Sequence, residues 1–358
     1  MSSLSRRLEK KIKLGLWTGL GFFLGSHPQA RNRPDLSQIR SALVVRPDRL
    51  GDVVLSLPVY ESLKKSIPGV RVTALVQAAH AEVLKYNPHV DRILAWNPAR
   101  PWQIATQLRR EKFDLALTLH HQFSATASLL TRASRARWRV GYDHPQNAWI
   151  HHLRVPVTGQ PRHEIQNNLE LLKALGLTSR GETPKLFFQP QEVEATERFL
   201  RQNRAHPDRP LVLIKPGTRI PEWGWAPGKF QEVTAELMRT GAAEVFIISG
   251  PGEEDWLNAF FEPLKVKPLR LSPMSLRQLA CLLSQSDLLF CNHTGIMHLA
   301  AAVQTPTLII FKHGEIARWG PRGNRHVLLE ERGGDDLDPA AVLQHLRQML
   351  TLEQTRTG

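Results

Sequence analysis

Asp52 lies where a carboxylate can take part in acid–base chemistry. The segment RPDRLGDVVLSLP, residues 46–58, follows an apolar run and opens a helical stretch. Gly51 permits a tight turn, so that Asp52 falls at the start of the helix, where free backbone N–H groups stabilise a negative charge. An ordinary helix cap is the simpler interpretation of this position by itself, and the other motifs must decide whether it is catalytic.

A second motif, CNHTGIMHLAAAVQTPTLIIF, spans residues 291–311 and has the pattern of strand, short loop, helix and strand. Thr294 and Gly295 present a hydroxyl and bare backbone N–H groups at a helix N-terminus, which is a natural seat for a diphosphate. His298 follows four residues after Thr294 on the same helix face. His298 either binds the diphosphate or is an ordinary helix histidine with a hydrogen-bond partner inside the protein.

Two further turns follow apolar strands. In LVLIKPGTRIPEW, residues 211–223, the strand ends in a Gly-Thr turn at Thr218 that can hold a phosphate oxygen. Lys215 and Arg219 add positive charge there or are solvated surface residues. In ISGPGEEDW, residues 248–256, Glu253 is placed to accept hydrogen bonds from ribose hydroxyls, although Pro-Gly-Glu-Glu by itself only indicates a helix start.

The elements that position these motifs alternate between short apolar runs and helical stretches, which predicts an α/β fold with parallel sheets. Two doubly wound halves are expected, with binding loops at the carboxyl ends of their strands. A helix over 165–175 and a proline-rich passage separate them. The expected strands cover residues 41–46, 70–76, 92–96, 114–119 and 138–142 in the first half, and 211–217, 244–250, 287–292 and 307–311 in the second.

A chain of 358 residues is too long for one ordinary core, so two domains are predicted. We expect an N-terminal tail and linker over 1–40, domains over 41–185 and 186–335, and a C-terminal helix and tail over 336–358. The apolar share of 42% and the charged share of 22% are typical of a globular protein. Two cysteines without CxxC spacing indicate a reducing compartment.

The formal net charge of +14 requires an anionic partner or surface. Residues 1–13 carry five basic side chains against one acidic one, and an apolar run over 14–25 follows, too short to span a bilayer. This amphipathic tail predicts a helix lying on an anionic membrane surface. A signal peptide and an ordinary packed helix are the alternatives.

A second basic group lies in the later part of the first domain and suits the phosphates and carboxylates of an anionic acceptor, or else is a solvated surface turn. Its residues are Arg132, Arg135, Arg137 and Arg139 around Trp138, followed by His151, His152 and Arg154.

Taken together, the motifs resemble glycosyltransferase family 9, the lipopolysaccharide heptosyltransferases, from about Ser41 to about Phe311. The resemblance rests on LGDVVLSLP, LVLIKPGTR, SGPGEE and SPMSLRQLACLLSQSDLLFCNHTGIMHLAAA. It implies a GT-B architecture of two Rossmann-like domains facing across a cleft. It also implies inverting transfer without a metal or cofactor, an ADP-sugar donor such as ADP-heptose in the second domain and a lipopolysaccharide-core or related glycolipid acceptor in the first. The expected location is cytoplasmic, peripheral on the inner face of the inner membrane.

Family roles carry over to individual positions. Asp52 matches the general base, and the acceptor is expected near Arg49, Gly51, Arg135, Arg137 and Arg139. The nucleotide-sugar is expected at Thr218, Glu253, Met274, His293, Thr294, Gly295 and His298.

The chain departs from the family pattern in two places. His293 precedes Thr294 and Gly295 where an aspartate is usual, and the loop after Thr218 carries Glu222 and no lysine. A family member that is non-catalytic or retargeted to another donor sugar is therefore an alternative, with Arg219 or a different arrangement holding the donor phosphate.

Other function classes fit less well. A nicotinamide-dependent dehydrogenase would carry GxGxxG after the first strand, and none is present. A nucleic-acid binder would explain the charge, but no recognised motif accompanies it. A sugar-nucleotide epimerase on the same two-domain fold remains an alternative, although it would need no lipid acceptor and therefore no basic tail.

Overall fold

The computed structural model describes residues 32–250, 252–312, 314–331 and 336–357. The chain divides into two compact units, Met1–Thr183 and Pro184–Gly358, which are described separately. The basic tail predicted to bind a membrane lies outside the described residues. Within the described ranges, no helix has both the length and the apolar character needed to cross a bilayer.

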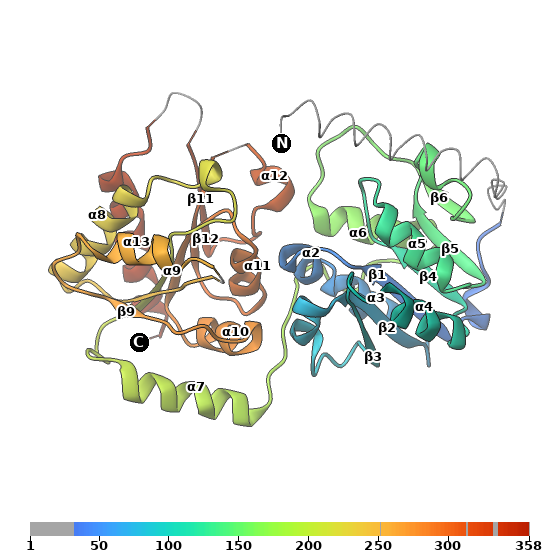
Figure 1. The fold of residues 1–358 in the computed structure, drawn as a ribbon, viewed down its shortest axis with the longest axis horizontal. Helices are drawn as coiled ribbons and strands as arrows, with labels where there is room; N and C mark the ends of the chain where they lie inside the picture. The colour runs from blue at the N-terminus through green and yellow to red at the C-terminus, as the bar shows by residue number, and fades with distance from the viewer. Residues whose placement is uncertain (1–31, 251, 313, 332–335, 358) are drawn as a thin grey trace. The chain divides into compact units, whose positions relative to one another are not determined.

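Unit 1 is built on a six-stranded parallel sheet in the order β3-β2-β1-β4-β5-β6 (Figure 1). All six residues of the central strand β1 are buried, as expected for a strand covered on both faces. The strands are β1 (Ser41–Arg46), β2 (Arg71–Gln77), β3 (Arg92–Trp96), β4 (Leu115–Thr118), β5 (Trp138–Tyr142) and β6 (Leu153–Val155).

Helices cover both faces of this sheet. Leu43 and Val45 of β1 pack with Ile104 and Leu108 of α4 and with Leu130 of α5. On the other face α3 packs on β2, and α6 contacts α2 and α3. The helical elements are η1 (Leu36–Gln38), α2 (Leu50–Leu55), α3 (Leu57–Ser66), η2 (Ala78–Leu84), α4 (Pro101–Arg110), α5 (Ala125–Ala133), η3 (Pro145–Asn147) and α6 (Glu164–Ala174).

Unit 2 repeats this plan with a parallel sheet in the order β12-β11-β10-β7-β8-β9 (Figure 1). Counted from its own first strand, the order is the same as in unit 1, which is the Rossmann order. The strands are β7 (Leu211–Lys215), β8 (Glu244–Ile247), β9 (Leu269–Arg270), β10 (Leu288–Asn292), β11 (Thr307–Phe311) and β12 (His326–Glu330).

One face of the second sheet carries an apolar cluster in which Phe230 of α8, Phe290 of β10 and Leu346 of α13 are fully buried. The C-terminal helix α13 packs on α8, while α10 packs on α7 and α11. The helical elements are α7 (Pro190–Asn203), η4 (Pro221–Trp223), α8 (Pro227–Arg239), α9 (Glu254–Phe261), α10 (Leu276–Ser284), α11 (Gly295–Ala302), α12 (Ile316–Trp319) and α13 (Pro339–Thr357).

The α/β fold with two doubly wound halves is confirmed. In each sheet the strand order reverses next to the first strand, between β1 and β4 in unit 1 and between β7 and β10 in unit 2. Ligands of open α/β sheets bind outside the carboxyl ends of the strands at such switch points. These two edges are therefore where functional side chains are sought.

Candidate functional site

The carboxyl edge of the first sheet is organised around Arg46, the last residue of β1. Its side chain is only 3% exposed and meets three carboxylates. Nη2 lies 2.5 Å from Asp52 Oδ1 and 2.8 Å from Glu164 Oε1, and Nε lies 3.3 Å from Asp48 Oδ2. Burial by itself lowers the pKa of Arg46, but the three carboxylates outweigh it, so the pKa lies above its ordinary value. Arg46 is therefore a permanent cation in this edge.

Asp52 lies in the first turn of α2, as the sequence predicts. Partial positive charge at a helix N-terminus stabilises a carboxylate there. Only Oδ1 is used by Arg46, whereas Oδ2 accepts no hydrogen bond from the described residues. Because the side chain is half-buried, this second oxygen is available to a ligand. Asp52 is thus held by one oxygen and left open at the other, which is the arrangement that a general base requires.

Asp48 and His120 face each other across the switch point between β1 and β4. His120 Nε2 lies 2.5 Å from Asp48 Oδ2. Burial would raise the pKa of Asp48, but the interactions with His120 and the charge of Arg46 outweigh it, so the pKa lies below its ordinary value. Four ionisable groups besides Asp52 are therefore packed at this edge: Arg46, Asp48, His120 and Glu164.

The carboxyl edge of the second sheet has Lys215 at the equivalent place, the last residue of β7. It forms an ion pair with Glu253, which precedes α9 and accepts a hydrogen bond from Gly250 N at 2.6 Å. Burial lowers the pKa of Lys215 from its ordinary value, and Glu253 partly offsets this. A methyl group at Gly217 would lie 2.9 Å from both Glu253 Oε1 and Lys215 Nζ, so any larger residue there would force the ends of these side chains to shift.

Asn292, the last residue of β10, fixes the loop that carries Thr218. Its side chain is fully buried, and Nδ2 donates to Pro216 O at 2.7 Å. Its Oδ1 accepts from Trp225 N at 2.9 Å. One amide therefore holds both ends of the 216–225 loop against the switch point between β7 and β10. Since both hydrogen bonds are buried, the loop is positioned before any ligand arrives.

Thr294 and Gly295 lie at the N-terminus of α11, directly after β10. Thr294 makes no capping hydrogen bond with its side chain, and its buried Oγ1 has no hydrogen-bond partner among the described residues. A helix N-terminus of this kind suits an anion, and the roles of Thr294 and Gly295 in binding one stay a prediction.

Two predicted histidines flank this helix start. His293 stacks on Phe311, with ring centroids 4.5 Å apart, and burial lowers its pKa to about 4. It is therefore neutral near pH 7. His298 is buried in α11 and meets the Trp319 ring edge-on, with centroids 6.4 Å apart.

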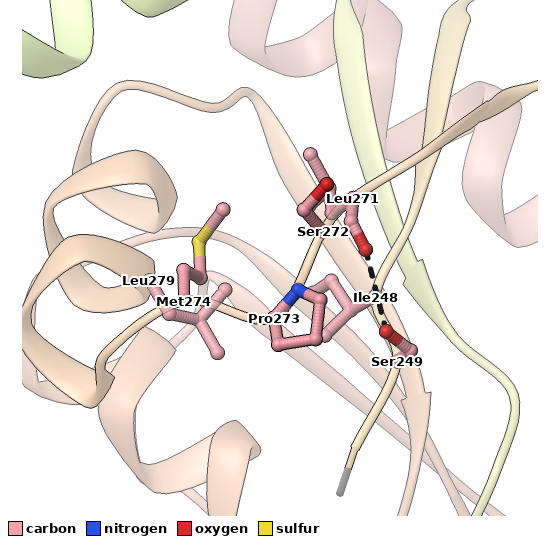
Figure 2. Close-up of a pocket in the computed structure, with 7 residues that line it drawn as sticks. All are labelled: Ile248, Ser249, Leu271, Ser272, Pro273, Met274 and Leu279. Atoms are coloured by element: carbon pink, nitrogen blue, oxygen red, sulfur yellow. Dashed lines mark hydrogen bonds between the residues drawn. The ribbon is translucent and has the colours of Figure 1, made fainter. Parts of the chain in front are cut away.

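Met274 lies in a pocket beyond the carboxyl ends of β8 and β9 (Figure 2). Apolar side chains form most of its lining, and the Ser249 hydroxyl donates to Leu271 O at 3.3 Å across one side. Such a lining, with few polar groups, suits a flat heterocycle. The lining residues are Ile248, Ser249, Leu271, Ser272, Pro273, Met274 and Leu279.

Comparison with known families decides what these two edges belong to. The model of glycosyltransferase family 9 (heptosyltransferase) matches residues 101–336, more than half of the chain. The chain belongs to glycosyltransferase family 9. It is accordingly an enzyme of the glycosyltransferase class.

Individual members of family 9 are distant from this chain in sequence. It is 25% identical to lipopolysaccharide heptosyltransferase 3 of Escherichia coli over 293 residues, which cover 77% of this chain and 85% of that protein. It is 22% identical to lipopolysaccharide heptosyltransferase 1 of Salmonella typhimurium over 291 residues, which cover 75% of this chain and 87% of that protein.

Solved family 9 structures share its fold. The glycosyltransferase family 9 protein of Veillonella parvula superposes with a TM-score of 0.80 at 19% identity, covering 89% of this chain and 99% of that one. The ADP-heptose lipopolysaccharide heptosyltransferase II of E. coli superposes with a TM-score of 0.75 at 17% identity. The match covers 88% of this chain and 100% of that one. The fold is thus that of the GT-B heptosyltransferases.

The structure places the residues predicted to bind the acceptor in separate parts of unit 1. Arg49 is exposed directly before α2 and Gly51 is buried within it, so both lie beside Asp52. Arg135 and Arg137 are exposed but precede β5, at the amino edge of a parallel sheet, where Arg137 Nη1 donates to Gln38 Oε1 at 3.4 Å. The structure therefore does not bring them together with Asp52.

Arg139 is engaged inside unit 1. Its side chain is buried and donates to Ile150 O at 2.6 Å and to Ala136 O at 3.0 Å. Nearby, His151 is fully buried with Nε2 2.9 Å from Thr118 Oγ1, and burial together with the positive charge of Arg139 lowers its pKa to about 3. Both side chains brace the sheet.

Several side chains of the two edges were missed in the sequence. Arg46 and Asn292 each end a buried apolar strand, and a polar residue at such a place is a usable signal. His120 follows the buried strand β4 closely and carries a similar signal. Glu164 carries no local pattern that marks it, since the packing of a distant helix brings it to Arg46. No group of three or more His, Cys, Asp or Glu side chains among the described residues is placed to hold a metal.

Proposed function

We propose that this family 9 enzyme transfers a heptose from ADP-heptose to a hydroxyl of a lipopolysaccharide-core acceptor, with Asp52 as the general base. The observation that carries the proposal is the state of Asp52: one carboxylate oxygen is held by Arg46 at 2.5 Å and the other faces no partner among the described residues. The relatives named as lipopolysaccharide heptosyltransferases support the choice of donor and acceptor.

In the proposed reaction the acceptor oxygen attacks the anomeric carbon of the heptose. The new C–O bond forms as the bond to the diphosphate oxygen breaks, and ADP leaves with that electron pair. The hydroxyl proton passes to Asp52 Oδ2. A single displacement of this kind inverts the anomeric configuration. Arg46 keeps the base aligned through its contact with Asp52 Oδ1.

Unit 2 would hold the donor. The apolar pocket at Met274 suits the adenine, and the second oxygen of Glu253 suits a ribose hydroxyl. The diphosphate would lie at Thr294 and Gly295, near Thr218. Negative charge that develops on the leaving diphosphate would be stabilised by these donors and the α11 N-terminus, which requires no metal.

The donor sugar is the least constrained part of the proposal. His293 is neutral near pH 7 and stacked on Phe311, whereas the family usually has an aspartate in this place. A neutral ring offers a sugar hydroxyl a weaker contact than a carboxylate does. Retargeting to another ADP-sugar is therefore the second candidate function, and a panel of ADP-sugars distinguishes it from heptose transfer.

The acceptor would be met at the cytoplasmic face of the inner membrane, with residues 1–13 binding anionic lipid through their basic side chains. Co-sedimentation of the full chain with phosphatidylglycerol vesicles, and none with phosphatidylcholine vesicles, is expected. Co-sedimentation with both kinds of vesicle, or with neither, would contradict this location.

The central test compares wild type, Asp52→Asn and Asp48→Asn with ADP-heptose and a truncated lipopolysaccharide acceptor, following ADP release and acceptor mass. Removing the base is expected to lower the rate by about 10²–10⁴-fold without changing ADP affinity. Asp48→Asn also removes a carboxylate beside Arg46 but leaves the proposed base in place, so the rate should fall much less. Equal losses in both variants would reject Asp52 as the base. A wild-type protein that binds no nucleotide would reject the proposed function as a whole.

A further inference from the structure

Lys312 lies at the same carboxyl edge of the second sheet as the predicted diphosphate ligands. It follows β11 directly, and His293 N donates to Ile310 O at 2.9 Å, so the β10–β11 pairing continues past the end of β10. Asn292 pairs with Ile310, and Cys291 pairs with Lys215. Thr218, Thr294 and Lys312 thus each follow the carboxyl end of one of three adjacent strands, β7, β10 and β11.

The Lys312 ammonium reaches the loop that carries Thr218. Its Nζ donates to Gly224 O at 3.4 Å. Gly224 is in close contact with that threonine, since a methyl group at Gly224 would lie 2.8 Å from Thr218 Cγ2. Lys312 therefore reaches the Thr218 loop from β11, which lies beyond β10 in the sheet. Its side chain is 37% exposed, so a ligand can reach it.

The positive charge of Lys312 is only partly compensated. Its Nζ lies 3.5 Å from Glu331 Oε2, and Lys229 Nζ lies 3.5 Å from the other oxygen of the same carboxylate. Lys229 also pairs closely with Asp336, so Glu331 is the one carboxylate that contacts Lys312 among the described residues, and that contact is long. Lys215, by contrast, is buried and paired closely with a carboxylate of its own. Of these two lysines, Lys312 is the more exposed and the more loosely paired.

We propose that Lys312 binds the diphosphate of the nucleotide-sugar and supplies, from β11, the positive charge that the loop after Thr218 lacks. This inference rests on the proposed function. That loop has Glu222 in a stretch where the family usually has a lysine. Glu331 orients Lys312 toward the loop, while Thr294 and the α11 N-terminus supply neutral donors to the same phosphates. Arg219, the loop cation that the sequence offers, is exposed and forms no hydrogen bond or ion pair with the described residues.

The test is calorimetric titration of the full chain with ADP and with adenosine, which lacks the phosphates. Lys312→Ala is expected to weaken ADP binding at least about 10-fold, because a charge-assisted hydrogen bond is lost, and to leave adenosine binding unchanged. Lys312→Arg keeps the charge and should stay within about threefold of wild type. Lys265→Ala, which changes an exposed lysine of unit 2, is the matched control and should stay within about twofold of wild type. Arg219→Ala removes the competing loop cation and should weaken ADP binding clearly less than Lys312→Ala does.

Different outcomes of this titration test the role of Lys312 and the proposed function separately. An unchanged ADP affinity in Lys312→Ala, or an equal loss in Arg219→Ala, would overturn the role of Lys312 while leaving the proposed function in place. Equal weakening of ADP and adenosine would also overturn it, since it would indicate a general loss of the site. Absence of ADP binding in wild type would instead reject the proposed function.

Discussion

Arg46 and Lys215 occupy the same place in the two units, yet their surroundings have opposite sign. Each ends the first strand of a sheet with the same strand order. Arg46 meets three carboxylates, whereas Lys215 meets one and shares its edge with Lys312 and the α11 N-terminus. In the proposed function, the shared fold fixes where a ligand binds, and the side chains around one cation decide whether that edge takes up a proton or an anion.

The largest expected effect comes from removing the central cations. Arg46→Met leaves three carboxylates without their shared partner, and we expect unit 1 to lose about 3–5 kcal/mol of stability. Lys215→Met strands one partly exposed carboxylate, and unit 2 should lose roughly 1–3 kcal/mol. Hydrogen exchange of the β1 amides measures the loss of stability in unit 1, and exchange of the β7 amides measures the loss in unit 2. Equal losses would remove the contrast between the two edges, and Arg46→Lys should recover part of the unit 1 loss.

The pH dependence of stability sharpens the comparison. His151 has a folded pKa of about 3 against an ordinary 6.5, so the unfolded chain takes up a proton first as the pH falls. Its contribution is complete above pH 6.5 and declines by roughly 1.4 kcal/mol per pH unit between 6.5 and 3. His151→Gln should flatten the acid loss of exchange protection in unit 1. His206→Gln, at an exposed position of unit 2, should change nothing, and an unchanged acid profile in His151→Gln would contradict the assignment.

The smallest expected effect tests how closely the Lys215–Glu253 pair is fitted. A methyl group in Gly217→Ala would push against both side chains at 2.9 Å, and ADP affinity should fall by about 5- to 10-fold. Gly228→Ala is the matched control, because its nearest neighbour would lie 3.8 Å away. Calorimetric ADP titration of both variants gives the answer, and equal affinities would show that the pair has room to move.

Much of the fold follows from the sequence because buried parallel strands are continuous apolar runs. The expected strand over 41–46 coincides with β1, and the other predicted strands match theirs within a few residues. The strands that were missed, β6, β9 and β12, are short or lie at or near a sheet edge with half-buried residues. Helix α7 was missed because only Thr196 of its residues is buried, so it carries little apolar periodicity.

The candidate site was predictable only where chemistry is local. Asp52 at a helix start and Thr294-Gly295 after a strand are visible in a few consecutive residues. Glu164 lies 118 residues from Arg46 along the chain and reaches it through the packing of α6 on α2. The run of arginines over 135–139 looked like one surface. Arg139 lies inside β5 and is buried with hydrogen bonds to Ile150 O and Ala136 O, whereas Arg137 precedes the strand and is exposed.

The buried amide of Asn292 has a consequence for the energetics of turnover. A loop fixed at both ends before the nucleotide arrives loses little chain entropy when it binds, so less of the contact energy is consumed in ordering the site. The same fixation means that ADP can depart without the 216–225 loop unfolding first. Donor exchange in this enzyme would then be governed by the diphosphate contacts themselves, and only weakly by the motion of the polypeptide that surrounds them.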